Sequence, residues 1–340
     1  MSSANAMKTD PMPSETILSV RNLKVHFDVG KGGFFNRRPA IVKAVDGVSF
    51  DLRAGETLGL VGESGCGKST LGRALLRLLA IKEGKVVWLG TDLASLDAEA
   101  MRQKRREMQI IFQDPLASLN PRMTIGQIIA EPLKTFNPGL SGAEVKRRVQ
   151  RMLAQVGLQP QHINRYPHEF SGGQCQRIGI ARAMINNPKL IVCDEPVSAL
   201  DVSIQAQIVN LLMDLQRETG MSLIFISHNL SVVRHISHRI MVLYLGRVAE
   251  IADRDTILTK PLHPYTQALI SAVPIPDPDL EQGKEMIILK GDLPSPLNPP
   301  SGCAFRTRCP KATEICAKLV PEFRTASFGH QVACHHAALD

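Results

Sequence analysis

The sequence reads Gly62-Glu63-Ser64-Gly65-Cys66-Gly67-Lys68-Ser69-Thr70 directly after the apolar run Thr57 to Val61, and a helical pattern runs from about Lys68 to Leu79. The stretch fits G-x-x-x-x-G-K-[ST]. Glycines let successive backbone N–H groups face an anion, and the N-terminus of the helix adds positive potential. Lys68 is expected to reach the β- and γ-phosphates and Ser69 to bind Mg²⁺. The strand, loop and helix together predict an α/β fold with a nucleotide-phosphate site.

A second chemical feature is a pair of carboxylates after the apolar strand Leu190 to Cys193. Charge at the end of a buried strand is costly unless it meets a cation. Asp194 is therefore expected to support the Mg²⁺ coordination shell, and Glu195 to polarise the water that attacks the γ-phosphate. The alternative is that both carboxylates merely cap the next helix. Beside the phosphate loop, the pair predicts hydrolysis of the nucleotide.

Short strand-like runs alternate with helical patterns up to about residue 260, which predicts a largely parallel sheet. A crossover helix is expected after the carboxylates, because apolar residues recur there at helical spacing. Its apolar face and two candidate caps are Ile204, Ile208, Leu211 and Leu215, with Asp201 or Ser203. Residues 17–29 and 41–52 are predicted as antiparallel strands, and 124–187 as a helical insertion without strands.

Further motifs lie in a characteristic order around these elements. They are Gln113 after the strand 109–112, Phe170-Ser171-Gly172-Gly173-Gln174 before a helix over 175–185, Ser198-Ala199-Leu200-Asp201 after the carboxylates, and His228 after the strand 222–227. With the phosphate loop, this set resembles the ATPase subunit of an ATP-binding-cassette (ABC) transporter over about residues 15–260. The resemblance implies a P-loop cassette with a RecA-like core, an N-terminal antiparallel β subdomain and a helical subdomain at about 120–188.

The resemblance also implies a role for each motif residue. Phe27 would stack on adenine, Gln113 would sense the metal and the attacking water, and His228 would contact the γ-phosphate. The signature segment and Asp201 would serve the second ATP site of a dimer: Ser171, Gly172 and Gly173, followed by Gln174, would bind the γ-phosphate held by the opposite subunit, and Asp201 would link the two sites. The segment opens with Phe170 instead of the commoner Leu, a change that removes no phosphate-binding group.

Motifs outside the catalytic set narrow the resemblance. They are the loop Gly30 to Pro39, the run Phe112 to Arg122, His263 to Thr266, and Leu293 to Cys303. These segments resemble dipeptide and oligopeptide importers, most closely the second of their two ATPase subunits. The resemblance implies a heterodimer with a paralogous ATPase, two transmembrane permease subunits, a periplasmic or extracellular peptide-binding protein, and a peripheral position on the cytoplasmic face of the inner membrane. Nickel and glutathione importers share much of this pattern, so they are alternatives for the substrate.

The last 80 residues form a separate predicted region, because they hold 11 of the 22 prolines and four of the seven cysteines. The predicted divisions are a flexible N-terminus (1–15), the cassette (16–260) and a C-terminal domain (261–340). Its cysteines are Cys303, Cys309, Cys316 and Cys334. Structural zinc sites favour close C-x₂₋₄-C pairs, which are missing, whereas four loop-borne thiolates suit an iron–sulfur cluster. The resemblance implies a [4Fe–4S] cluster, with zinc or four unligated thiols as alternatives. Cys66, Cys175 and Cys193 are predicted to pack and not to react.

Charge and composition narrow the class of protein further. The net charge is +8, from 40 basic and 32 acidic residues, and residues 261–340 hold seven basic and eight acidic ones, so the positive charge belongs to the cassette. No apolar run approaches the ~18 residues that cross a bilayer, and residues 1–16 do not resemble a secretory signal. Basic clusters at 102–106 and 146–151 come without a recognition motif, so no nucleic-acid partner is expected. A soluble ABC ATPase acting on nucleic acid or ribosomes is the alternative class, but it commonly carries a second cassette or a long coiled-coil insertion.

Overall fold

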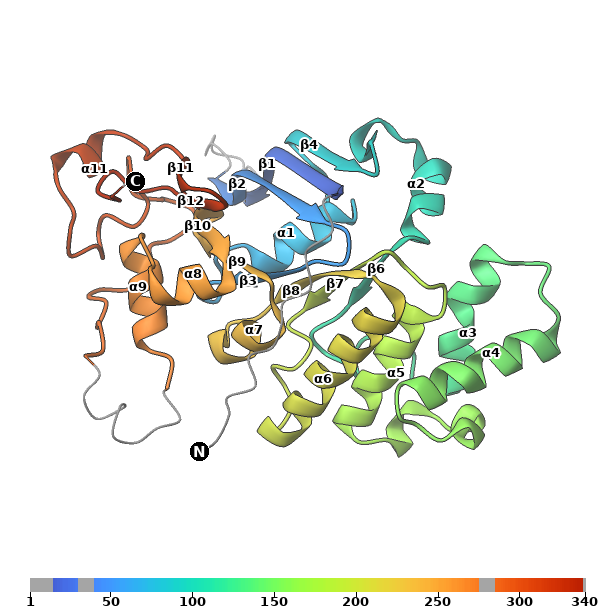
Figure 1. Cartoon of the computed structure of the whole chain (residues 1–340). Helices are drawn as coiled ribbons and strands as arrows, with labels where there is room; N and C mark the ends of the chain where they lie inside the picture. The colour runs from blue at the N-terminus through green and yellow to red at the C-terminus, as the bar shows by residue number, and fades with distance from the viewer. Residues whose placement is uncertain (1–14, 30–39, 275–284, 339–340) are drawn as a thin grey trace, which may run out of the picture.

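A computed structural model describes residues 15–29, 40–274 and 285–338 of the chain. The loop 30–39 and nearly all of the predicted N-terminal segment lie outside the described residues. Figure 1 shows the arrangement of the elements. The strands are β1 (Thr16–Val29), β2 (Ala40–Arg53), β3 (Thr57–Val61), β4 (Glu83–Trp88), β5 (Thr91–Asp92), β6 (Met108–Ile111), β7 (Leu190–Asp194), β8 (Ser222–Ile226), β9 (Arg239–Tyr244), β10 (Arg247–Asp253), β11 (Arg324–Ser327) and β12 (His330–Val332).

The α-helices are α1 (Lys68–Leu75), α2 (Ala98–Arg105), α3 (Ile125–Phe136), α4 (Gly142–Gln155), α5 (Gly172–Met184), α6 (Val202–Thr219), α7 (Leu230–Ile236), α8 (Arg254–Thr259), α9 (Pro264–Ser271) and α11 (Glu314–Lys318). Three short 3₁₀ helices complete the described part of the chain: η1 (Leu93–Ser95), η2 (Pro160–Asn164) and η3 (Pro167–Glu169).

The main sheet has eight strands in the order β11-β12-β10-β9-β3-β8-β7-β6. Strands β9, β3, β8, β7 and β6 are parallel to one another, whereas β10 pairs antiparallel with β9, and β12 and β11 continue the sheet with antiparallel pairs at that edge. Every residue of β3, β7 and β8 is buried. A sheet that is covered on both faces requires such continuous apolar strands, which explains why the sequence shows short apolar runs and not an alternating pattern.

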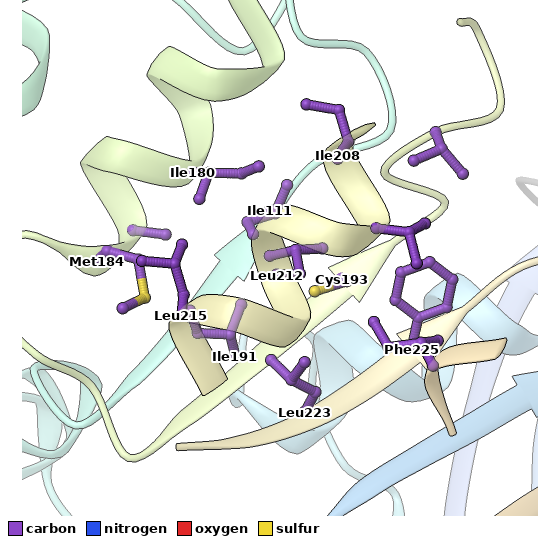
Figure 2. Close-up of a cluster of buried hydrophobic side chains, with 14 of the residues drawn as sticks. Ile111, Ile180, Met184, Ile191, Cys193, Ile208, Leu212, Leu215, Leu223 and Phe225 are labelled. Atoms are coloured by element: carbon purple, nitrogen blue, oxygen red, sulfur yellow. The ribbon is translucent and has the colours of Figure 1, made fainter. Parts of the chain in front are cut away.

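Successive side chains of the central strands enter two different cores, because side chains alternate across a strand. In β7, Ile191 and Cys193 face the core beneath α5 and α6, whereas Leu190 and Val192 face α1 and the antiparallel sheet. Figure 2 shows the first core, in which Leu212 and Leu215 of α6 pack over the strands. The phosphate-binding loop therefore rises from a strand that is fixed on both faces.

The N-terminal strands form a separate antiparallel sheet in the order β2-β1-β4-β5. Strands β1 and β2 pair over most of their length, from Thr16 opposite Arg53 to Val29 opposite Ala40. Figure 1 shows α1 between this sheet and the main sheet. Both the predicted antiparallel pair and the predicted parallel core are confirmed.

The predicted helical insertion is also confirmed, since residues 124–187 contain α3, α4, α5 and two 3₁₀ helices but no strand. Two of the helix ends differ from the prediction. Helix α1 ends at Leu75 instead of Leu79, because Arg77 adopts a left-handed φ of 50°. Helix α5 begins at Gly172 and not near Cys175, because the Ser171 hydroxyl and the Gln174 side chain form a capping box.

The C-terminal region is attached to the cassette through the main sheet. Strand β12 pairs with β10 at Glu250 and Ile251, and β11 pairs with β12. Tyr265 and Phe305 are buried in the same apolar core as the helical region. The domain boundary near residue 260 stays a prediction. No helix within the described ranges is long and apolar enough to cross a membrane.

Candidate functional site

The backbone of the phosphate loop has a conformation that requires glycine. Gly67 has a φ of 104°, and a Cβ atom there would lie 2.1 Å from the carbonyl oxygen of Ala44 in β2. At Gly62 a Cβ atom would lie 2.3 Å from the carbonyl oxygen of Leu243. Real Cβ atoms do not approach backbone this closely, so the loop packs directly against the backbone of β2 and β9. Glycine is therefore required at both Gly67 and Gly62.

Lys68 is held inside the loop. Its side chain is 3% exposed, and Nζ donates to the carbonyl oxygens of Gly62 at 2.9 Å and Glu63 at 3.0 Å. Nζ also lies 4.0 Å from Oε1 of Glu195. A buried ammonium group needs such acceptors, and here they place its charge between the loop and the acidic end of β7.

Ser69 and Asp194 form the second contact between loop and sheet. The Ser69 hydroxyl donates to Oδ1 of Asp194 at 2.5 Å, and Arg73 of α1 donates to Oδ2 at 3.3 Å. Asp194 is 1% exposed. A hydroxyl and a carboxylate are the hard oxygen ligands that Mg²⁺ prefers, so the donor set fits the expected metal.

Glu195 follows β7 in a left-handed conformation with a φ of 47°. Its Oε2 accepts a hydrogen bond from Nε2 of Gln113 at 3.4 Å and lies 3.1 Å from Nδ1 of His228. Strained backbone at a non-glycine residue is frequent at functional sites, where the surrounding fold holds it in place. Residues 82 and 33 positions away in the sequence thus meet at one carboxylate.

These residues surround one open cleft of about 870 Å³. The predicted site residues that line this cleft are Ser64, Gly65, Gly67, Lys68, Ser69, Thr70, Gln113, Glu195 and His228. Lys43, Ala44, Gly246 and Pro296 also line it, and the sequence did not point to them. Phe27, the predicted adenine contact, is not among the lining residues, although it pairs in the sheet with Val42, which is. Its role stays a prediction.

The predicted signature segment lies apart from this cleft. Ser171, Gly172 and Gln174 are exposed at the start of α5, and no residue of the segment lines the cleft in the described structure. Asp201 stands at the N-terminus of α6, and its side chain caps no helix N–H. Gly173 of this segment packs against α6, where a Cβ atom would collide with the side chain of Ile204. One chain therefore does not bring the phosphate loop and the signature segment together.

The cassette cysteines are buried, as predicted. Cys66 is 1% exposed, and burial raises the pKa of its thiol to about 11. Burial also raises the pKa values of Cys175 and Cys193 above the usual range. Since the thiolate is the reactive form, burial and these pKa shifts favour the predicted packing role over a reactive one.

The four C-terminal cysteines gather in one part of the molecule. Burial raises the pKa of the Cys303 thiol to about 11, and charges on Cys316, Cys309 and Cys334 act in the same direction, so the thiols lie near one another. The donor chemistry suits iron–sulfur or zinc. Within the described residues, however, no group of three or more His, Cys, Asp or Glu side chains is placed to hold a metal ion. The cluster therefore stays a prediction.

The sequence also missed contacts that hold Glu63 of the phosphate loop. Its backbone N–H donates to the Tyr265 hydroxyl at 2.9 Å, and its carboxylate accepts from Arg308 at 2.9 and 3.0 Å. Both partners belong to the C-terminal region, more than 200 residues away. The motif leaves the identity of this loop position open, so no sequence signal marked the contacts.

Known proteins share both parts of this chain. A family profile described as ABC transporter matches residues 45–198, and one described as oligopeptide/dipeptide transporter, C-terminal region, matches residues 249–316. The oligopeptide transport ATP-binding protein OppF of Salmonella typhimurium is 61% identical over 94% of this chain and 96% of its own length. The chain belongs to the ATPase subunits of ABC transporters. Within this family, OppF of Escherichia coli is 60% identical over the same shares, and AppF of Bacillus subtilis is 54% identical over 94% of this chain and 97% of its own.

Solved structures confirm the ABC cassette fold. A dimeric ATP-binding cassette in a post-hydrolysis state, bound to ADP and phosphate, matches with a TM-score of 0.63 and 30% identity. The match covers 70% of this ABC subunit and 99% of that chain.

Proposed function

We propose that this chain is the ATP-hydrolysing subunit of an importer for oligopeptides and dipeptides. One observation carries the proposal: a complete phosphate loop faces Glu195 and His228 across one cleft, in a chain that also has an oligopeptide-transporter C-terminal region. Relatives at 54–61% identity are oligopeptide transport ATP-binding proteins. The work of transport then comes from ATP, and this chain need not contact the peptide.

The site residues have distinct proposed roles. Lys68 and the loop N–H groups bind the β- and γ-phosphates, while Ser69 and Asp194 hold Mg²⁺ with support from Gln113. The metal, when bound, neutralises charge on the phosphates. Glu195 accepts the hydrogen bond of the attacking water. His228, which lies 3.1 Å from that carboxylate, contacts the γ-phosphate of the bound ATP.

The second half of each ATP site is proposed to come from another chain. The exposed Ser171-to-Gln174 segment has no phosphate-binding partner in its own cleft, and the related cassette structure is a dimer. A paralogous ATPase, two permeases and a peptide-binding protein complete the proposed assembly. In this proposed assembly, the subunit lies on the cytoplasmic face of the inner membrane.

We further propose that Cys303, Cys309, Cys316 and Cys334 hold a [4Fe–4S] cluster, with zinc as the alternative. Support comes from the four neighbouring thiols, none of which forms a disulfide. Protein purified without oxygen should be brown and contain iron and sulfide in equal amounts. Colourless protein with one zinc per chain would overturn the iron–sulfur assignment.

The transport function is tested with the full complex in proteoliposomes. A labelled oligopeptide should accumulate only when ATP and the binding protein are present. Nickel and glutathione are the matched competitors, and uptake of either one in place of the peptide would contradict the proposal. Purification of this chain with ribosomes or DNA-repair proteins, and without permeases, would reject transport altogether.

A further inference from the structure

Glu63 ties the phosphate loop to the C-terminal region. Arg308 donates from Nη1 to both carboxylate oxygens of Glu63, at 2.9 and 3.0 Å. Tyr265 of α9 accepts the Glu63 N–H at 2.9 Å. Both the side chain and the backbone of a loop residue are therefore held by residues that lie outside the nucleotide-binding motifs.

The partners of Glu63 are themselves fixed by packing. Tyr265 is fully buried, and its ring lies 4.7 Å from that of Tyr244 and 5.4 Å from that of Phe305. The Arg308 side chain is 10% exposed and its backbone N–H donates to the Phe305 carbonyl at 3.0 Å. Buried aromatic packing of this kind allows little movement. The contacts with Glu63 are thus anchored and not loose surface pairs.

The negative charge of Glu63 is the reason why its ion pair with Arg308 affects ATP binding. Glu63 belongs to the loop proposed to cradle the phosphates. Like charges repel, so an uncompensated carboxylate in this loop disfavours the ligand even though Glu63 does not itself line the cleft. Arg308 offsets that charge. Tyr265 occupies the Glu63 N–H, and Lys68 donates to the Glu63 carbonyl oxygen, so the same residue also sets the position of the loop lysine.

We propose that Arg308 is a positioning residue for ATP: it neutralises Glu63 and, with Tyr265, holds the phosphate loop in its binding conformation. The C-terminal region thereby sets the ATP affinity of the cassette. The inference rests on the ATP-binding function proposed above and adds a control point outside the family motifs.

The test measures MgATP binding to the purified full-length chain, with ATPase activity of the complete transporter as a second readout. Arg308→Gln keeps much of the side chain's length and removes the charge. It should weaken MgATP binding roughly tenfold and raise KM for ATP by a similar factor, with kcat changed less than about twofold. Arg308→Lys should retain most of the affinity. Arg306→Ala is the control, because the hydrogen bonds of the Arg306 side chain in the described structure go to Ser301 of the same region.

A second substitution separates charge from packing. Glu63→Gln in the Arg308→Gln background should restore most of the lost affinity, because the repulsive carboxylate is gone. Unchanged affinity of Arg308→Gln would overturn the proposal while ATP binding by the parent chain remained intact. A loss that Glu63→Gln does not restore, or one that Arg306→Ala shares, would also overturn it. If Arg308→Gln fails to fold, Arg308→Met, which also removes the charge, replaces it with and without Glu63→Gln, and the same criterion decides. Failure of the parent chain itself to bind MgATP would instead refute the proposed function.

Discussion

The two segments of this chain that are proposed to bind phosphate are built in opposite ways. The phosphate loop is enclosed by distant parts of the chain, with Gly67 against the Ala44 carbonyl and Lys68 buried beneath the loop. The signature segment is exposed and is held chiefly by its own capping box between Ser171 and Gln174. The difference teaches that the fold encloses the phosphate loop and leaves the signature segment accessible, as the proposed sharing of each ATP site between two chains requires.

The largest expected effect is on ATP turnover and comes from a substitution beside the enclosed phosphate loop. Glu195→Gln should lower ATP turnover of the assembled transporter by roughly 10²–10⁴-fold, because it removes the proposed acceptor for the water proton. MgATP binding should remain, since the amide has the same shape. Phosphate release and equilibrium binding are the two measurements. Exposed Glu218 near the end of α6 offers a control, as Glu218→Gln should leave both unchanged. Undiminished turnover in Glu195→Gln would reject the assigned role.

Gly67 of the phosphate loop and Gly172 of the signature segment test the difference between the two segments directly. Gly67→Ala forces a Cβ atom against β2 in a left-handed conformation, at a cost of about 3 kcal/mol or roughly 100-fold in MgATP affinity. Gly172→Ala meets only Leu200 at 3.6 Å, an ordinary contact. The isolated Gly172→Ala chain should melt and bind MgATP like its parent, whereas hydrolysis by the complete transporter should fall. Equal binding defects in the two variants would contradict the distinction.

Thiol reactivity also tests whether the phosphate loop is enclosed and the signature segment exposed. Because burial raises the pKa of Cys66 to about 11, little thiolate is present at pH 8, and its reaction should accelerate as the pH rises toward that value. A cysteine introduced by Gln174→Cys on the exposed segment should react at least about tenfold faster at pH 8. Mass spectrometry of the labelled peptides resolves each site. Comparable rates at pH 8 would show that the loop interior is open to solvent.

The smallest effect concerns helix capping. Ser171 and Ser141 each cap a helix by accepting a backbone N–H three residues on. Replacement by Ala should cost about 1 kcal/mol of unfolding free energy at either position. Ser171→Ala alone should lower ATP turnover in the assembled transporter. Denaturant unfolding measures the first effect and phosphate release the second. Loss of turnover in Ser141→Ala to the same degree would assign the whole effect to helix stability.

Local patterns in the sequence were enough to predict much of the fold. The apolar runs of β3, β7 and β8 and the helical spacing of α6 were recognised because runs of apolar residues and periodicity are local properties of the sequence. The start of α5 was missed by three residues, since the capping box at Ser171 competes with the helix-breaking tendency of two glycines. Within the site, Lys68, Ser69 and Glu195 were predicted, whereas Lys43 and Arg73 were not, because neither lies in a motif.

The sequence by itself determined the chemistry: a phosphate loop, an acidic strand end and a signature segment whose residue types and order carry their own physical requirements. Tertiary structure alone decided which of these groups meet. It brought His228 to Glu195 and Arg308 to Glu63, and it kept the signature segment away from its own cleft. The reason is physical, because motifs and hydrophobic periodicity are properties of near neighbours in the chain, whereas the hydrogen bond between residues 245 positions apart depends on how whole layers pack.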